Sequence, residues 1–131
     1  ATHLFLPSSQ CYFSQDGAND VKGNPGPANV IYAANCFAHM EYVHAIVEGI
    51  VEMLAPDGVF ISESHYLIGL LDDLQYDTVY HEHLRHYTVG SLAYLLGMHG
   101  LALVFFAILY LPFAVYDVVA AIRLRASSRV A

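Results

Sequence analysis

Hydrophobic and polar positions divide the chain into short segments with different periods. Val30–Ala34 is a compact apolar run without polar alternation, which is typical of a strand buried on both faces of a parallel sheet. Met40–Leu54 repeats apolar residues every three or four positions, and this spacing predicts an amphipathic helix. Pro56–Gly58 would end that helix and turn the chain, so that Val59–Ile61 begins a second short strand.

The order strand, helix, turn, strand predicts one crossover unit of an α/β sheet. In such sheets, ligands bind beyond the carboxyl ends of the strands. These ends fall near Asn35–His39 and near Glu63–Tyr66, and both segments carry polar and aromatic side chains. We therefore expect a ligand site at this edge of the sheet.

Further elements are predicted on both sides of this unit. Asp16–Asn29 is rich in Gly, Pro, Asn and Asp, so it is interpreted as a loop. After the second strand, the pattern predicts a short helix, a helix capped by Thr88 and ending near Gly100, and a final pair of strands. Their expected ranges are Leu67–Leu74, Val89–Met98, Leu101–Leu109 and Phe113–Leu124.

The apolar stretch that begins at Leu101 also raises the question of a membrane span. An arginine cluster follows it, as it would follow a membrane helix. Pro112 and Asp117 lie inside the stretch, however, and the uninterrupted apolar run is shorter than the roughly 20 residues that a span needs. A strand pair that turns near Pro112 is therefore favoured over membrane insertion.

Composition narrows the classes of function. The chain has 131 residues, 56% of them hydrophobic, which suits one small domain or part of a larger one. A net charge of -7 with only five Lys and Arg argues against a nucleic-acid partner. The two cysteines, Cys11 and Cys36, form no disulfide framework, so a reducing cytoplasm is predicted.

The candidate chemistry is concentrated in Tyr76–Tyr87, which holds three His, three Tyr, two carboxylates and one Arg. Histidine suits proton transfer near neutral pH, and tyrosine can donate a hydrogen bond to a developing oxyanion. The alternative interpretation is a polar surface loop. A metal site is a second alternative, because His81 and His83 would share one face of an extended segment, with His39 or His86 as third ligand. The triplet is not an HExxH motif, and no metal is predicted.

The remaining candidates are weaker when each is taken alone. His39 lies in the segment after the first strand, at the expected ligand edge, but it could equally be a solvated histidine at a helix start. Asn35 could be a turn former. Cys36 is assigned to packing. The other histidines are assigned structural or solvated roles: His3, His44, His65 and His99.

Together these segments resemble S-adenosylmethionine-dependent C-methyltransferases that act on nucleotide-linked deoxysugars. The resemblance runs from about Cys11 to Leu103, and its most specific part is the run Tyr-Asp-Thr-Val-Tyr-His-Glu-His at residues 76–83. The other matching segments are Cys11–Ser14, Ala28–His39, Leu54–Glu63 and Tyr87–Leu92.

The resemblance implies a fold, a cofactor and a reaction. The fold would be the second half of a Rossmann-like class I methyltransferase sheet. The cofactor would be S-adenosylmethionine, with Ala34, Asn35 and Phe37 beside its methionine end, and the substrate a nucleotide-linked keto-deoxysugar. A base would remove a proton beside the keto group to give an enolate, which takes the methyl group. The positions that match the catalytic ones are His83 as base, with Tyr80, Glu82 and His39 as partners that position the sugar or stabilise the enolate.

Several features of the family pattern are not found in the sequence. A glycine-rich first turn, an acidic residue for the cofactor ribose and zinc-binding cysteines are not identifiable, and the segment from 104 to 131 diverges from the family. The chain is therefore interpreted as a partial methyltransferase domain, family-like over 11–103, whose activity in isolation is not expected. The alternatives are a non-catalytic α/β fragment or partner-binding module, a membrane-associated protein and a histidine-cluster metalloprotein.

Overall fold

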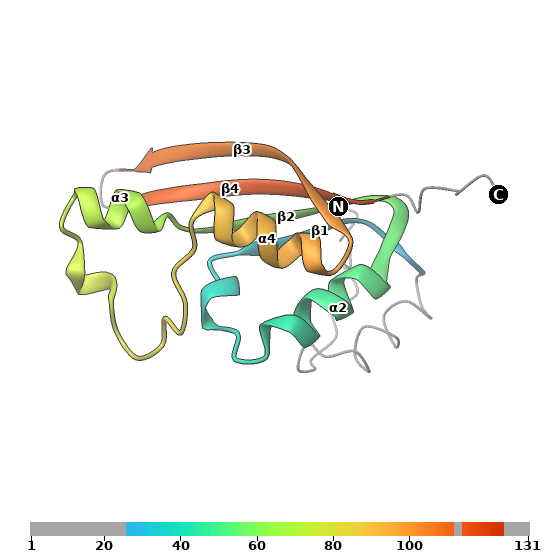
Figure 1. Cartoon of the computed structure of the whole chain (residues 1–131), viewed down its shortest axis with the longest axis horizontal. Helices are drawn as coiled ribbons and strands as arrows, with labels where there is room; N and C mark the ends of the chain where they lie inside the picture. Colours follow the sequence, from blue (N-terminus) through green and yellow to red (C-terminus); the bar gives the residue numbers. More distant parts are fainter. Residues whose placement is uncertain (1–25, 112–113, 125–131) are drawn as a thin grey trace, which may run out of the picture.

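The computed structural model describes residues 26–111 and 114–124, which form one mixed sheet with helices packed against it (Figure 1). The strands are β1 (Ala28–Ala34), β2 (Leu54–His65), β3 (Leu101–Leu111) and β4 (Ala114–Arg123), in the spatial order β1-β2-β4-β3. β1 and β2 are parallel, whereas β4 is antiparallel to both of its neighbours. The predicted crossover unit and the predicted final strand pair are therefore confirmed.

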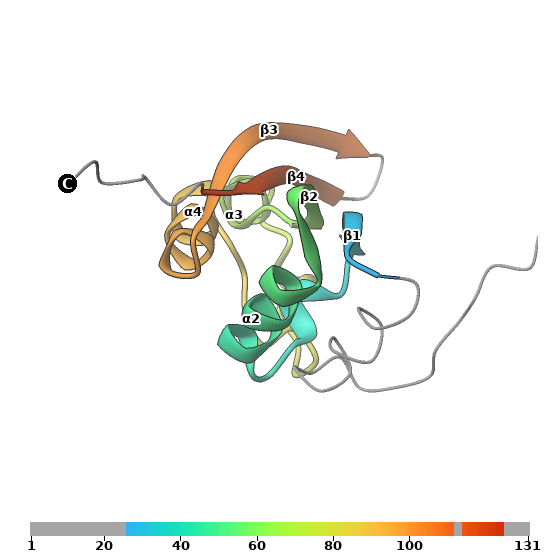
Figure 2. The same cartoon turned by 90° about the vertical axis from the view of Figure 1, so that its right-hand side faces the viewer.

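The helices of the described residues lie on one face of this sheet (Figure 2). They are α2 (Val43–Met53), α3 (Leu67–Asp72) and α4 (Val89–Met98), with short 3-10 turns η1 (Phe37–His39) and η2 (Tyr76–Thr78). On the helix side, Phe60, Ser62 and Ser64 of β2 are buried, and the alternation of a strand turns the intervening residues to the other face.

The exposure of side chains on β1 corrects the interpretation of the first strand. Val30 and Tyr32 of β1 are 59% and 58% exposed, whereas Ala33 is buried. The prediction that Val30–Ala34 is buried on both faces is wrong for the described structure, because the described helices cover only one face of the sheet. An unalternated apolar run shows that both faces of a strand are apolar, but it cannot show which of them is covered.

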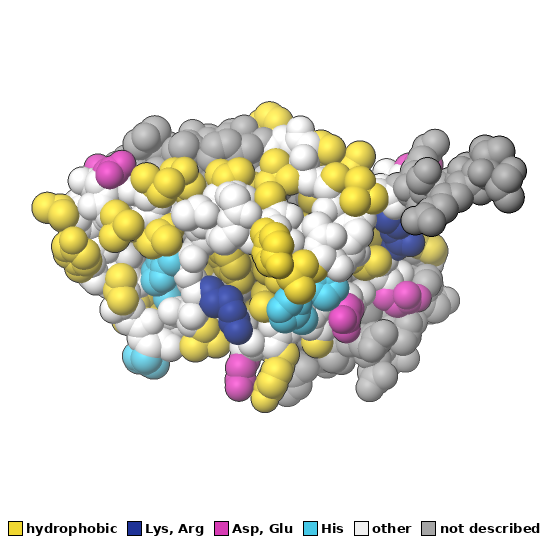
Figure 3. Space-filling view, viewed as in Figure 1, with side chains coloured by type: hydrophobic (Ala, Val, Ile, Leu, Met, Phe, Trp, Pro, Cys, Tyr) yellow, Lys and Arg dark blue, Asp and Glu magenta, His cyan; other side chains and the backbone are white. Residues whose placement is uncertain are grey.

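The core lies between the sheet and the helices. α2 contributes Val47 and Ile50, and α4 contributes Leu92 and Leu96, to a buried cluster that includes Phe37 and Phe60. Arg123 of β4 fixes the end of α2 from the sheet, since its guanidinium donates to the carbonyl oxygens of Val51 and Leu54. Carbonyl groups at the end of a helix have no partner in a following turn, so a cation is a favourable neighbour for them. Apolar side chains also reach the surface around α3, on the face shown in Figure 3.

The element bounds differ from the predicted ones in several places. The helix predicted over Met40–Leu54 begins at Val43, because η1 and an extended Met40 precede it. β2 begins at Leu54, directly after α2, and Pro56–Gly58 lies within its bounds, where the ladder with β1 is irregular between the pairs Ala28–Leu54 and Val30–Val59. α3 ends two residues before the predicted Leu74, which has a positive φ of 54°.

The remaining predictions either are confirmed by the structure or concern residues that it does not describe. α4 has the predicted bounds, and Thr88 and Ser91 form a reciprocal capping box at its start. The turn expected near Pro112 and most of the loop expected over Asp16–Asn29 lie outside the described residues, as do His3 and Cys11. In the part of the chain that the structure describes, no helix is long and apolar enough to cross a membrane.

Candidate active site

His83 stands at the centre of the ring cluster that is the candidate site. It follows a turn in which its backbone N–H donates to the carbonyl oxygen of Tyr80 over 3.0 Å. Its Nδ1 lies 2.7 Å from the carbonyl oxygen of Thr78. A carbonyl only accepts hydrogen bonds, so Nδ1 carries the proton and Nε2 keeps a lone pair. The Tyr80 hydroxyl lies 3.3 Å from Nε2 and donates to it. A tautomer fixed in this way presents an imidazole base beside a phenol.

His39 reaches the same cluster from the other side of the chain. It ends η1, in the segment after β1, and its Nδ1–H donates to the carbonyl oxygen of Glu82 over 2.8 Å. Its ring centroid lies 4.6 Å from that of His83. The two segments singled out in the sequence, Asn35–His39 and Tyr76–Tyr87, therefore meet in space.

Arg85 fastens these two segments together. Its Nη1 donates to the carbonyl oxygen of Met40 and its Nη2 donates to that of Glu41 over 2.8 Å. A planar guanidinium that holds two carbonyls fixes orientation as well as distance. In the sequence, Arg85 is only one charge within the dense segment, whereas in the structure it holds these two carbonyls in position.

The residues between Tyr80 and His83 depart from the sequence-based interpretation. The segment forms a turn at 81–82, so His81 and His83 do not share one face as an extended segment would require. The side chain of His81 is 91% exposed, and it lies 4.0 Å from the exposed Glu82 carboxylate. Glu82 contacts His39 through its main chain. Across the described residues, no group of three or more His, Cys, Asp or Glu side chains is arranged to hold a metal ion.

Two further histidines belong to the cluster: His65, which was assigned a structural or solvated role from the sequence, and His86, which was considered there only as a possible metal ligand. Their ring centroids lie 5.2 Å and 5.6 Å from that of His83. Burial lowers the pKa of both imidazoles, and the nearby His83 lowers it further, although a hydrogen bond to the Thr78 backbone opposes the shift at His86. Both groups are therefore neutral at physiological pH. For His65, one signal was available, because it lies in Glu63–Tyr66, near the expected carboxyl end of the second strand.

The expected cofactor positions divide into two environments. Ala34 and Asn35 are exposed at the carboxyl end of β1, where Asn35 has a positive φ of 49°. The N–H of Asn35 donates to the carbonyl oxygen of Glu63 over 2.8 Å, which holds this end of β1 to β2. Phe37 is fully buried against Phe60 and Tyr87. A contact from Phe37 to a ligand would therefore have to come from its backbone.

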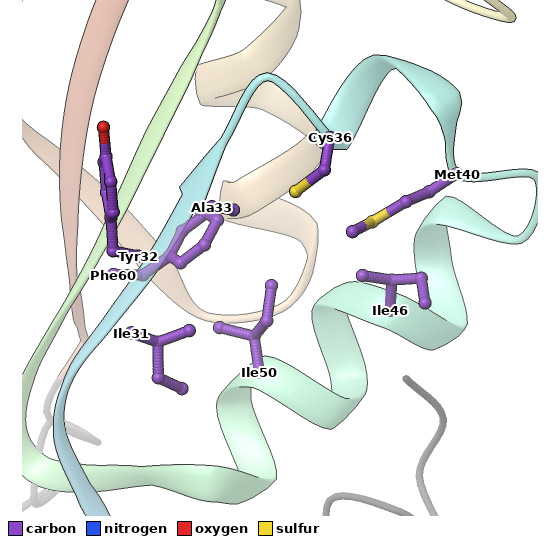
Figure 4. A pocket seen from close by; sticks show the side chains of 8 residues that line it. All are labelled: Ile31, Tyr32, Ala33, Cys36, Met40, Ile46, Ile50 and Phe60. Carbon is purple, nitrogen blue, oxygen red and sulfur yellow. The ribbon is translucent and has the colours of Figure 1, made fainter. Parts of the chain in front are cut away.

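An apolar cavity of about 150 Å³ lies between β1 and α2, beside the exposed end of β1. Figure 4 shows Ile31 pointing toward Ile50 of α2, whereas the Tyr32 ring points away from it. Cys36 lines the cavity and packs against the core, as the sequence predicted, and burial raises the pKa of its thiol. A thiol in that state is a poor nucleophile, which agrees with a packing role. The full lining is Ile31, Tyr32, Ala33, Cys36, Met40, Ile46, Ile50 and Phe60.

Comparison with known proteins decides the family. The model of the methyltransferase domain matches residues 7–104, which is most of the chain. This chain is a member of the methyltransferase-domain family. The C-methyltransferase NovU from Streptomyces niveus is 38% identical over 92 residues, which are 70% of this chain and 22% of the relative. The methyltransferase chain thus spans about a fifth of the curated relative that it matches.

Solved methyltransferases share the fold of this family member. The 1,6-didemethyltoxoflavin-N1-methyltransferase from Burkholderia thailandensis, solved with S-adenosylhomocysteine, matches with a TM-score of 0.59 at 18% identity. The match covers 74% of this chain and 44% of that one. Magnesium protoporphyrin IX methyltransferase from Synechocystis matches with a TM-score of 0.58 at 14% identity, over 75% of this chain and 46% of that one. The predicted Rossmann-like methyltransferase fold is therefore confirmed for the described part.

Proposed function

We propose that this chain carries the catalytic part of an S-adenosylmethionine-dependent C-methyltransferase that acts on a nucleotide-linked keto-deoxysugar. The observation that carries the proposal is the fixed tautomer of His83, whose Nε2 lone pair lies beside the Tyr80 hydroxyl. Membership of the methyltransferase-domain family and the likeness to a C-methyltransferase support the transfer of a methyl group to carbon.

His83 is the general base of the proposed reaction. A carbon next to a keto group is a weak acid, so its deprotonation requires a base and a partner for the developing oxyanion. Nε2 of His83 takes the proton while Nδ1–H stays on the Thr78 carbonyl, which then stabilises the imidazolium. The neutral His65 and His86 nearby add no positive charge to oppose this transfer.

Tyr80 and His39 are the proposed partners of the base. The Tyr80 hydroxyl turns from Nε2 to the sugar keto oxygen and stabilises the enolate. His39, fixed through its Nδ1–H to the Glu82 carbonyl, presents its Nε2 edge to the sugar. Glu82 acts through this main-chain contact, and its exposed carboxylate is available to the nucleotide-sugar from solvent.

Ala34 and Asn35 are the residues that would hold the methionine end of the cofactor. They fit this role because they are exposed at the carboxyl end of a parallel strand, where ligands of such sheets bind. The backbone of Phe37 continues the same segment. S-adenosylmethionine, when bound there, would supply an electrophilic methyl group to the deprotonated sugar carbon.

Replacement of His83 tests the proposal against a neighbouring histidine. In deuterated water, the protein that carries this chain should exchange the proton beside the keto group and, with S-adenosylmethionine, should methylate that carbon. His83→Asn should reduce both reactions by about 10²–10⁴-fold, because a positioned general base contributes that much. His81→Asn should leave both unchanged, since the His81 side chain is exposed. Mass spectrometry of the sugar measures both reactions.

Two outcomes would count against this assignment. Retained exchange in His83→Asn would move the role of base elsewhere, with His39 as the next candidate. No exchange and no methyl transfer by the unsubstituted protein would favour the alternative of a non-catalytic, partner-binding module.

A further inference from the structure

The carbonyl oxygen of Thr78 lies where more than one donor can reach it. Thr78 is the last residue of η2, and its N–H and its hydroxyl both donate to the Gln75 carbonyl, over 3.3 Å and 2.8 Å. The last carbonyls of a helical turn are not used by the turn itself, and each carbonyl oxygen has two lone pairs. The Thr78 oxygen is therefore available to two side-chain donors.

Two imidazoles of the ring cluster use this oxygen. Nδ1 of His83 lies 2.7 Å from it. Burial and the nearby His83 lower the pKa of His86, whereas a hydrogen bond to the Thr78 backbone raises it. A hydrogen bond that raises an imidazole pKa is one in which the ring donates, so the acceptor is the Thr78 carbonyl. The two rings are nearly perpendicular, at 88°, with centroids 5.6 Å apart, an arrangement in which both can reach one oxygen.

The donor atom of His86 is its Nδ1. Nε2 of this ring is buried and has no hydrogen-bond partner among the described residues. A neutral imidazole carries one proton, so Nε2 keeps a lone pair that is closed to solvent. Protonation there would bury an unpaired N–H, which is unfavourable. His86 is therefore a neutral donor and not a second base.

His86 is also held by the sheet, whereas His83 is not. The next residue, Tyr87, is buried and forms a parallel bridge with Tyr66, directly after β2. In the part of the chain that the structure describes, the hydrogen bonds of His83 reach no farther than Thr78. The contact from His86 to Thr78 therefore connects a fixed part of the fold to the turn that carries the candidate base.

We propose that His86 is a positioning residue of the candidate site, which holds the Thr78 carbonyl on Nδ1 of His83 and so keeps the lone pair of the base on Nε2. The hydrogen bond at one ring nitrogen decides which nitrogen carries the proton, so a carbonyl that turned away would leave the tautomer of His83 unfixed. The inference rests on the proposed function for the role of His83 as base, whereas the tautomer depends on the described contacts alone.

Nuclear magnetic resonance of the protein that carries this chain tests the tautomers directly. Histidine is isotope-labelled, and each ring is assigned through bonds to its own backbone. Nitrogen chemical shifts at about pH 8.5, above the ordinary pKa of histidine, show which nitrogen carries the proton. His83 and His86 should both carry it on Nδ1. A proton on Nε2 of His86 would overturn the proposal, and this measurement needs no variant.

A matched pair of variants at position 86 separates donation from packing. His86→Leu removes the donor, and His83 should then become a mixture of both tautomers. His86→Asn places an amide N–H near the position of Nδ1 and should keep His83 in the Nδ1–H form. A role in packing alone predicts the opposite order, because leucine fills an apolar space better than asparagine does. Unchanged amide spectra of β2 and α4 show that both variants are folded.

The same variants show the consequence for the proposed reaction. In His86→Leu, kcat for methyl transfer should fall by about two- to tenfold, because one hydrogen bond of ordinary strength is worth that factor. KM for the sugar should stay within about twofold, since His86 does not contact it. His86→Asn should restore kcat to within about twofold of the original protein.

Three outcomes bear on the proposal in different ways. A fixed Nδ1–H tautomer of His83 in folded His86→Leu, or its loss in both variants, would overturn it. If His86→Leu does not fold, the tautomers of the unsubstituted protein and of His86→Asn decide. Tautomers that behave as expected in a protein without proton exchange or methyl transfer would reject only the proposed function.

Discussion

At the scale of single residues, the candidate site depends on main-chain acceptors more than on pairs of side chains. The Thr78 carbonyl sets the tautomer of His83, and the Glu82 carbonyl sets the orientation of His39. An imidazole can act as a base only through the nitrogen that keeps its lone pair. The backbone of the Tyr76–Tyr87 segment therefore determines which atom of His83 faces the Tyr80 hydroxyl.

His65 and His86 predict a loss of stability in mild acid. Folding lowers the pKa of both side chains below 6.5, so between the folded values and pH 6.5 the unfolded chain binds more protons than the folded one. Their contribution to the free energy of unfolding is therefore present above pH 6.5 and is lost as the pH falls through the folded pKa values. Urea unfolding at about pH 7.5 and at about pH 5 should show this loss.

The control for this pH effect uses a third histidine. His65→Gln should make the difference in unfolding free energy between the two pH values smaller, whereas His81→Gln should leave it unchanged because His81 is exposed. An equal pH effect in both variants would mean that other groups cause the acid sensitivity.

At the scale of elements, the sequence predicts what local periodicity and capping determine. α4 has its predicted bounds because Thr88 and Ser91 form a capping box and Gly100, with a positive φ of 76°, follows its end. The start of α2 was missed, because His39 of η1 and the following Met40 are held by hydrogen bonds to a distant segment. Their partners there are the Glu82 carbonyl and the Arg85 guanidinium. The length of β2 was also missed, because Leu54 already pairs with Ala28 of β1, and Pro56–Gly58 lies in an irregularity of the ladder between that pair and the pair of Val30 with Val59.

Two glycines in different elements should respond to alanine in opposite directions. A Cβ on Gly58 would lie 2.8 Å from the Ala28 carbonyl oxygen and 2.9 Å from two side-chain atoms of Leu54. Gly58→Ala should therefore lower the free energy of unfolding by about 1–3 kcal/mol. Gly97 lies in α4 with open space around it, so Gly97→Ala should raise that free energy by about 0.5–1 kcal/mol. Chemical denaturation of both variants measures the two changes, and a destabilised Gly97→Ala would contradict this account.

At the scale of the whole molecule, the candidate site is a product of long-range contacts. The family resemblance implied that His39 and His83 belong to one site, and the distance of 4.6 Å between their ring centroids is consistent with that expectation. His65 lies in Glu63–Tyr66, at the expected ligand edge, but no local pattern joined it to the ring cluster. His44 instead pairs with His99 across α2 and the end of α4. The cytoplasmic location and the individual site roles stay predictions.

Arg85 should limit the mobility of residues 39–42 and 80–87 together. Arg85→Met keeps the length of the side chain but removes its hydrogen bonds to the Met40 and Glu41 carbonyls. Amide exchange should then become faster in 39–42 and in 80–87 together, while α4 and β2 stay protected. Exchange that rises in only one of the two segments would show that Arg85 does not couple them.

The hydrogen bonds from Arg85 to two main-chain carbonyls restrict sequence variation at position 85 but not at positions 40 and 41. Every residue type offers a carbonyl oxygen, so positions 40 and 41 can exchange their side chains without loosening this attachment. Position 85 has no comparable freedom, because a forked planar cation is needed to reach both oxygens. Among related sequences, positions 40 and 41 should therefore hold many residue types, whereas position 85 should stay arginine.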